Sequence, residues 1–188
     1  MAEVLLFHHA HGLTPGVVAF ADELRAAGHV IHTPDLYEGK TFDTVDEGVA
    51  HAREVGFGTI LERGRAAAED LPAGLVYAGF SLGGMPAQML AQTRAGARGA
   101  LLFHATLPLS EFGGSWPEGV PAQIHFMEED PWAEEDLPVA REIADTADEA
   151  ELFLYPGDRH LFADSSLPDY DEHCADLLMQ RVLEFLAD

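Results

Sequence analysis

Apolar and polar positions form blocks of two kinds along this chain. Short apolar runs alternate with longer segments whose apolar residues are spaced as on one face of a helix. The strand-like runs are Val4–Phe7, His29–Thr33, Leu75–Phe80, Ala100–His104, Ala122–Met127 and Ala150–Tyr155. The helix-like segments are Val17–Ala27, Thr59–Asp70, Met85–Thr93, Leu137–Asp148 and Tyr170–Ala187. This alternation predicts an α/β fold with a mostly parallel sheet and helices on both faces.

No repeat, linker or low-complexity tract divides the sequence, so we expect one domain over residues 1–188. The carboxyl ends of parallel strands meet at one edge of a sheet, where α/β proteins bind ligands. Polar residues follow nearly every predicted strand. Those of interest are His8, His9, His11, Asp35, Tyr37, Ser81, His104, Glu128 to Trp132, and Asp158 to His160.

Charge narrows the range of partners. The formal net charge is −23, and Lys40 is the only lysine. Such a surface repels phosphates and anionic lipids, so we expect neither nucleic acid nor a membrane as a partner. Glu3 and a short apolar run at the start do not fit a secretory signal, and no apolar run has the length of a membrane span. Cys174 is the only cysteine. We therefore predict a cytoplasmic protein without intrachain disulfides.

One motif carries chemistry of its own. Gly79-Phe80-Ser81-Leu82-Gly83 has the form Gly-x-Ser-x-Gly, with a predicted strand before it and a predicted helix after it. This is the context of a nucleophile elbow, a sharp turn that presents a serine at the sheet edge. The alternative is a glycine-rich turn with a solvent-facing serine.

An activated serine needs a histidine that takes its proton and a carboxylate that orients the histidine. In the elbow context these follow in the order serine, acid, histidine. Asp130 follows the fifth predicted strand, and His160 follows the sixth. Glu128 and Glu129 compete with Asp130 for the acid, and His104 is the rival of His160.

Together these motifs resemble the dienelactone hydrolase family over nearly the whole chain. The resemblance rests on Pro34-Asp35-Leu36-Tyr37, on Gly79 to Gly84, on Asp130-Pro131, and on Tyr155-Pro156-Gly157 ahead of His160 and Phe162. It implies a three-layer α/β-hydrolase fold without a large cap domain, and a Ser81, Asp130 and His160 triad.

The resemblance also implies an oxyanion hole from the backbone N–H groups of Leu82 and a residue near Ala10, and no cofactor. We expect the substrate pocket to be lined from the loops after the strands, by His9, His11, Tyr37, His104 and Trp132.

Three departures from the family pattern affect the substrate. Ser81 stands where members that act on dienelactone usually carry a cysteine. The family's glutamate after the first strand is replaced around His9. Asp164 stands where an arginine would hold the substrate carboxylate. These changes keep the hydrolase chemistry and argue against dienelactone as the substrate.

The histidines of the first loop allow another interpretation. Strand geometry puts His9 and His11 on one side, as in the start of a zinc site, but no further ligand set is evident, so we expect no metal. The loop also lacks the Gly-x-Gly-x-x-Gly of a dinucleotide site.

The sequence thus predicts a serine hydrolase, monomeric or homodimeric, that acts on a small ester, lactone or thioester. The alternative is a catalytically silent protein that binds small molecules on the same fold.

Overall fold

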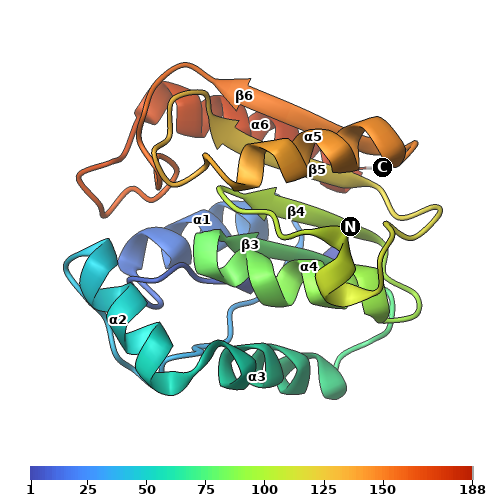
Figure 1. Cartoon of the computed structure of the whole chain (residues 1–188), viewed down its shortest axis with the longest axis horizontal. Coiled ribbons are helices and arrows are strands. Elements are labelled where there is room, and N and C mark those ends of the chain that lie inside the picture. The colour runs from blue at the N-terminus through green and yellow to red at the C-terminus, as the bar shows by residue number, and fades with distance from the viewer. Residues whose placement is uncertain (188) are drawn as a thin grey trace.

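Six parallel strands form a single sheet in the order β2-β1-β3-β4-β5-β6 (Figure 1). The computed structural model describes residues 1–187, so Asp188, the last residue of the predicted domain, lies outside the described residues. The strands are β1 (Glu3–Phe7), β2 (Val30–His32), β3 (Val76–Phe80), β4 (Gly99–Phe103), β5 (Ala122–Met127) and β6 (Ala150–Tyr155).

Helices cover both faces of the sheet and give a three-layer structure. They are α1 (Pro15–Ala26), α2 (Val45–Val55), α3 (Phe57–Glu69), α4 (Gly84–Thr93), α5 (Asp136–Thr146) and α6 (Glu172–Ala187). None of them, within residues 1–187, combines the length and the apolar character that crossing a bilayer requires.

Two separate apolar clusters hold the layers together, because successive strand side chains point to opposite faces. In β1, Leu5 and Phe7 belong to the cluster beneath α3, α4 and α5, while Val4 and Leu6 belong to the cluster beneath α1 and α6. All four side chains are fully buried. The expected parallel sheet between two helical layers is therefore confirmed.

The order of the strands determines where a site can form. From β1 the chain moves outward to β2, and then returns to β3 on the other side of β1. At such a reversal the loops that follow the two neighbouring strands diverge and leave a crevice at the carboxyl ends. This edge is on the left in Figure 1, and it bears the loops that follow β1, β3, β5 and β6.

One helix was not expected from the apolar pattern. Helix α2 carries Val45, Val49, Ala52 and Val55 at helical spacing, but these apolar residues are few and small, and only Gly48 and Ala52 are buried. A second signal lies at its start, where the Thr44 side chain accepts a hydrogen bond from the Glu47 N–H. A threonine three residues before a glutamate is a capping box, and this signal could have predicted the helix.

Candidate active site

Ser81 occupies a sharp turn between β3 and α4. Its φ of 47° is in the left-handed region that non-glycine residues rarely adopt. The two glycines of the motif make this turn possible: a Cβ on Gly79 would lie 2.0 Å from the Gly83 carbonyl oxygen, and one on Gly83 would lie 2.5 Å from that of Phe7. The strained backbone, held by close contacts that only glycine permits, is the geometry of a nucleophile elbow.

The structure brings Ser81, His160 and Asp130 into one hydrogen-bonded line. Ser81 Oγ lies 2.7 Å from His160 Nε2, and His160 Nδ1 lies 2.6 Å from Asp130 Oδ2. A carboxylate only accepts, so Nδ1 carries the imidazole proton and Nε2 is free to accept the proton of the serine. His160 and Asp130 are both buried. In this arrangement the imidazole can act as a base toward Ser81.

Of the three adjacent acids after β5, only Asp130 turns inward. Its second oxygen, Oδ1, accepts the Trp132 N–H at 2.8 Å, so both carboxylate oxygens have a partner. Glu128 and Glu129 are exposed, and their backbone N–H groups pair with the carbonyls of Tyr155 and Gly157. The position of Asp130 at the bend of this loop separates it from its neighbours.

A cleft of about 230 Å³ lies against Ser81 and His160. Its walls include Met85, His104, Thr106, Leu107, Trp132 and Asp136. Two of the residues expected in the pocket, His104 and Trp132, are therefore part of its lining. Met85, Thr106, Leu107 and Asp136 were not anticipated. Thr106 and Leu107 follow His104 in the loop after β4, so the strand-end argument that indicated His104 extends to them.

Asp136, the first residue of α5, is half-buried at this cleft. Its Oδ2 accepts the Thr106 N–H at 3.2 Å. Burial raises the pKa of the Asp136 carboxyl, and the Thr106 hydrogen bond opposes this shift. In the sequence Asp136 is an acid directly before the predicted helix Leu137–Asp148, a position where acids are too common to identify a site residue.

His104 is buried beside the proposed base. Its ring centroid lies 5.9 Å from that of His160 and 4.8 Å from that of Phe162. Within residues 1–187 neither of its ring nitrogens has a hydrogen-bond partner. Burial, with His160, His125 and His9 nearby, holds the pKa of His104 well below its ordinary value, so the ring is neutral. Its φ of 65° is also left-handed.

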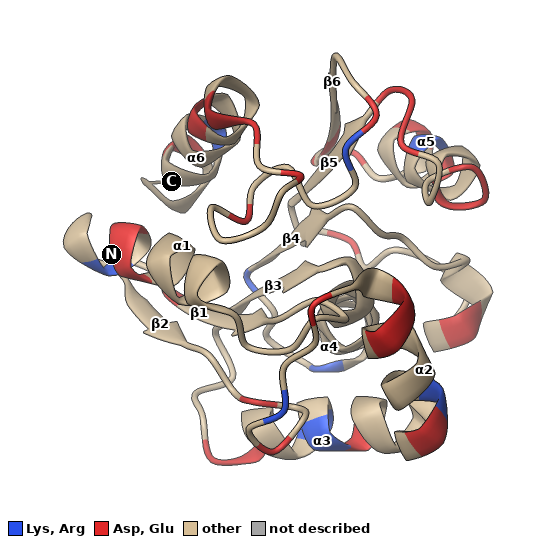
Figure 2. Cartoon of the chain, turned by 90° about the vertical axis from the view of Figure 1, so that its left-hand side faces the viewer, with Lys and Arg blue, Asp and Glu red and all other residues tan. Residues whose placement is uncertain are grey.

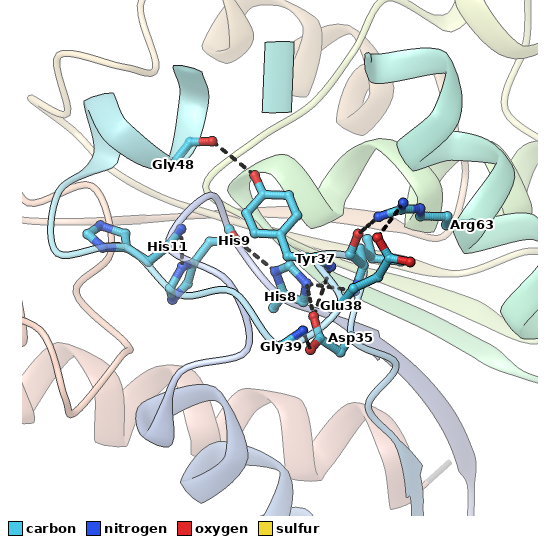
Figure 3. Close-up of polar contacts among 10 residues, drawn as sticks. His8, His9, His11, Asp35, Tyr37, Glu38, Gly39, Gly48 and Arg63 are labelled. Atoms are coloured by element: carbon cyan, nitrogen blue, oxygen red, sulfur yellow. Dashed lines mark hydrogen bonds and ion pairs between the residues drawn. The ribbon is translucent and has the colours of Figure 1, made fainter. Parts of the chain in front are cut away.

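The first loop is built on its histidines. His8 Nδ1 donates to the His9 carbonyl at 2.8 Å, and its Nε2 accepts the Leu36 N–H at 2.9 Å (Figure 3). His11 Nδ1 lies 2.9 Å from the Phe42 carbonyl oxygen and donates to it. These bonds tie the loop after β1 to the segment after β2.

His9, the second histidine of this loop, faces the segment that follows His160. Its Nδ1 accepts the His11 N–H, which leaves the proton on Nε2, and Nε2 donates to Asp164 Oδ2 at 2.6 Å. Burial alone would raise the pKa of Asp164, but hydrogen bonds from His9, Ser166 and Thr14 lower it to about 2. Asp164 is therefore enclosed within the protein. Its alignment with the family's arginine had suggested a place facing a substrate carboxylate, but Asp164 is not part of the lining of the cleft.

Tyr37 is buried under α2. Its hydroxyl donates to the Gly48 carbonyl at 3.1 Å (Figure 3), and burial raises its pKa to about 12. The structure therefore corrects the expected pocket: Tyr37, His9 and His11 support the first loop and are not part of the lining of the cleft. The reason is that their side chains have partners in the loops and helix behind it.

The two expected oxyanion donors lie in suitable backbone settings. Leu82 is in the first turn after Ser81, where N–H groups lack intrahelical partners. Ala10 is in the turn of the first loop, and its N–H donates to no acceptor in residues 1–187. Helix α2 packs closely on this turn, because a Cβ on Gly48 would lie 2.0 Å from the Ala10 carbonyl oxygen.

Within residues 1–187 no group of three or more His, Cys, Asp or Glu side chains is arranged to hold a metal ion.

Solved structures share this fold at low sequence identity. A dienelactone hydrolase from Anabaena variabilis aligns with a TM-score of 0.72 and 17% identity, covering 100% of this chain and 86% of the other. A promiscuous phosphotriesterase from metagenomic libraries, described as dienelactone hydrolase-like, gives a TM-score of 0.78 at 17% identity and coverages of 100% and 86%. Est1E from Butyrivibrio proteoclasticus, solved with ferulic acid, gives 0.66 at 16%, with 100% and 88% covered.

These neighbours confirm the α/β-hydrolase fold, and no large cap domain interrupts it within residues 1–187. A comparison with curated proteins gave no match. The sequence itself matches the dienelactone hydrolase family over residues 1–188. With the fold, the serine elbow and this match in agreement, the chain belongs to the dienelactone hydrolase family and is a hydrolase.

Proposed function

We propose that this hydrolase cleaves a small ester, lactone or thioester through an acyl-enzyme on Ser81. The observation that carries the proposal is the hydrogen-bonded line from Ser81 Oγ through His160 to Asp130, at 2.7 and 2.6 Å. A binding protein without catalysis has no need of a strained serine aligned with a histidine and a buried carboxylate.

In the first step Ser81 Oγ attacks the substrate carbonyl carbon while His160 Nε2 takes the hydroxyl proton. Asp130 holds the proton on Nδ1 and stabilises the imidazolium. The N–H groups of Leu82 and Ala10 bind the oxyanion, and in comparable sites each such donor contributes about 3 kcal/mol. His160 then gives its proton to the leaving alcohol or thiol.

The second half of the cycle repeats this chemistry with water. His160 takes a proton from the water that attacks the acyl carbon. The intermediate then collapses, and the proton passes to Ser81 Oγ as the acid is released. Every proton and bond is accounted for by the substrate, water and these side chains, so the reaction requires no cofactor.

Covalent labelling by a fluorophosphonate probe tests the proposal, because only an activated serine reacts. We expect the wild type to be labelled and to hydrolyse short-chain esters, and Ser81→Ala to lose both properties while keeping its fold. Cys174→Ser is the matched control, since Cys174 is buried in α6, away from the cleft. Turnover by purified Ser81→Ala would contradict the assignment. An unlabelled, inactive wild type would favour a silent binding protein.

A further inference from the structure

The cleft beside Ser81 has an unusual distribution of charge. Asp136 contributes a half-buried carboxylate, and among the described residues no lysine or arginine belongs to the lining. The one hydrogen bond to this carboxylate comes from a neutral donor, the Thr106 N–H. A partly desolvated carboxylate without a cationic partner interacts strongly with any positive charge that enters.

The cationic and imidazole groups nearest in sequence to the site do not fill this role. The Arg159 guanidinium donates to the Tyr170 carbonyl at 2.7 Å and lies 3.7 Å from Asp171, on the loop that leads into α6. His104 is neutral because burial depresses its pKa. His9 is paired with Asp164 behind the first loop. Among residues 1–187, the lining of the cleft therefore has no cationic group to neutralise a substrate carboxylate, except the proposed base once it is protonated.

An aromatic face accompanies the carboxylate. Trp132 lines the same cleft, with 47% of its surface exposed and its ring centroid 5.8 Å from that of His160. Its backbone N–H is fixed on Asp130 Oδ1, so the residue stands at a defined position beside the base. A tryptophan face attracts ammonium groups through its quadrupole. An exposed tryptophan and a carboxylate in the lining of one cleft are thus a combination suited to a cation.

The field of the whole molecule acts in the same direction. Figure 2 shows Asp and Glu segments around the loops at the carboxyl edge of the sheet, with few Lys or Arg segments among them. With a net charge of −23, the protein attracts cations toward this edge and repels anions.

We propose that the cleft is selective for esters that carry an ammonium group in their alcohol or acyl part, bound by Asp136 and Trp132. This inference rests on the proposed hydrolysis at Ser81 and names its substrate class. A partly exposed charge pair together with a cation–π contact is expected to raise kcat/KM about tenfold over a neutral isostere at low salt. Carboxylate-bearing esters of the same size are the poorest substrates.

Isosteric ester pairs test this selectivity. Acetylcholine, the acetate ester of choline, and 3,3-dimethylbutyl acetate differ in the alcohol part by a positive nitrogen in place of a carbon. Betaine ethyl ester and ethyl 3,3-dimethylbutanoate make the same comparison in the acyl part. The quantity measured is the ratio of kcat/KM for the charged and neutral members, at low and high salt. We expect a clear preference for the charged member of at least one pair.

Two matched variants separate a local subsite from the general field. Asp136→Asn keeps the acceptor for the Thr106 N–H and removes the charge, so the ratio should fall about tenfold toward that set by intrinsic reactivity. Glu134→Gln removes one exposed charge from the same loop without touching the cleft, and should leave the ratio unchanged. A ratio that survives in Asp136→Asn, or that falls equally in Glu134→Gln, overturns the proposal.

A binding measurement distinguishes failure of the subsite from failure of the proposed function. Tetramethylammonium should slow fluorophosphonate labelling of the wild type and have less effect on Asp136→Asn. Labelling of Ser81 that tetramethylammonium does not slow contradicts the cation subsite and leaves the serine hydrolase intact. No labelling at all contradicts the serine hydrolase.

Discussion

Buried histidines make the stability of this fold sensitive to mild acid. His8 is fully buried in the first loop, and burial, the largest cause, lowers its pKa from 6.5 to about 4. His125 is fully buried in β5, and burial together with Arg181 lowers its pKa from 6.5 to about 3. Below pH 6.5 the unfolded chain binds protons at these sites while the native protein does not. Stability is therefore fully present above the unfolded pKa and is lost as the pH falls toward the native values.

The size of the effect follows from the linkage relation. A pH of about 5 is about 1.5 units below the unfolded pKa of each histidine, and each is still mostly neutral in the folded protein. Protonation of the unfolded chain at each site therefore lowers the free energy of unfolding by about 2 kcal/mol. Together they remove about 4 kcal/mol, from a total that is typically about 5–15 kcal/mol. His9 and His104 are shifted in the same direction and add to the loss. The depressed carboxyl pKa of Asp164, about 2, acts only below its unfolded value of 3.8, outside this window.

Urea unfolding at about pH 7.5 and about pH 5 measures the loss of unfolding free energy. Salt at about 0.5 M screens the repulsion between carboxylates at both pH values, so that their protonation at the lower pH has little effect on the difference. His8→Gln and His125→Gln each remove one titrating group. In each variant the difference between the two pH values should shrink by about 2 kcal/mol, whatever the absolute stability. A wild-type loss under about 1 kcal/mol, or variants with an unchanged difference, would refute the reasoning.

Two further predictions concern the acid and the elbow. Asp130→Asn should lower kcat by about 10⁴-fold in an ester assay without unfolding the protein, because the amide no longer fixes the His160 tautomer; Glu128→Gln and Glu129→Gln should stay near wild type, and the reverse pattern would move the acid within the loop. Gly79→Ala should lower the melting temperature and abolish activity, because its Cβ would lie 2.0 Å from a backbone oxygen. In the control Gly58→Ala the new Cβ would enter open space at a helical position, so the free energy of unfolding should rise by up to about 1 kcal/mol. Equal behaviour of the two variants would contradict the argument.

The local geometry of the elbow and the order of the helices and strands could be predicted from the sequence. Gly79 and Gly83 identify a turn that other residues cannot form, and apolar runs located all six strands within a residue or two. Helix α2 was missed because its apolar residues, although helically spaced, are few and small, and only Gly48 and Ala52 are buried. Cytoplasmic location and the monomeric or dimeric state stay predictions.

Only the tertiary structure decided which polar residues meet. Asp130 differs from Glu128 and Glu129 because the bend after β5 turns it toward His160, and no local pattern encodes that direction. His9 and Asp164 pair across 155 positions of sequence. Because of this pair, both side chains support the first loop, although the sequence had suggested that they face the substrate. Asp136 is part of the lining of the cleft because α5 begins beside the loop after β4. Periodicity records which face of an element is buried, whereas contacts between loops depend on how the strands are ordered in the sheet.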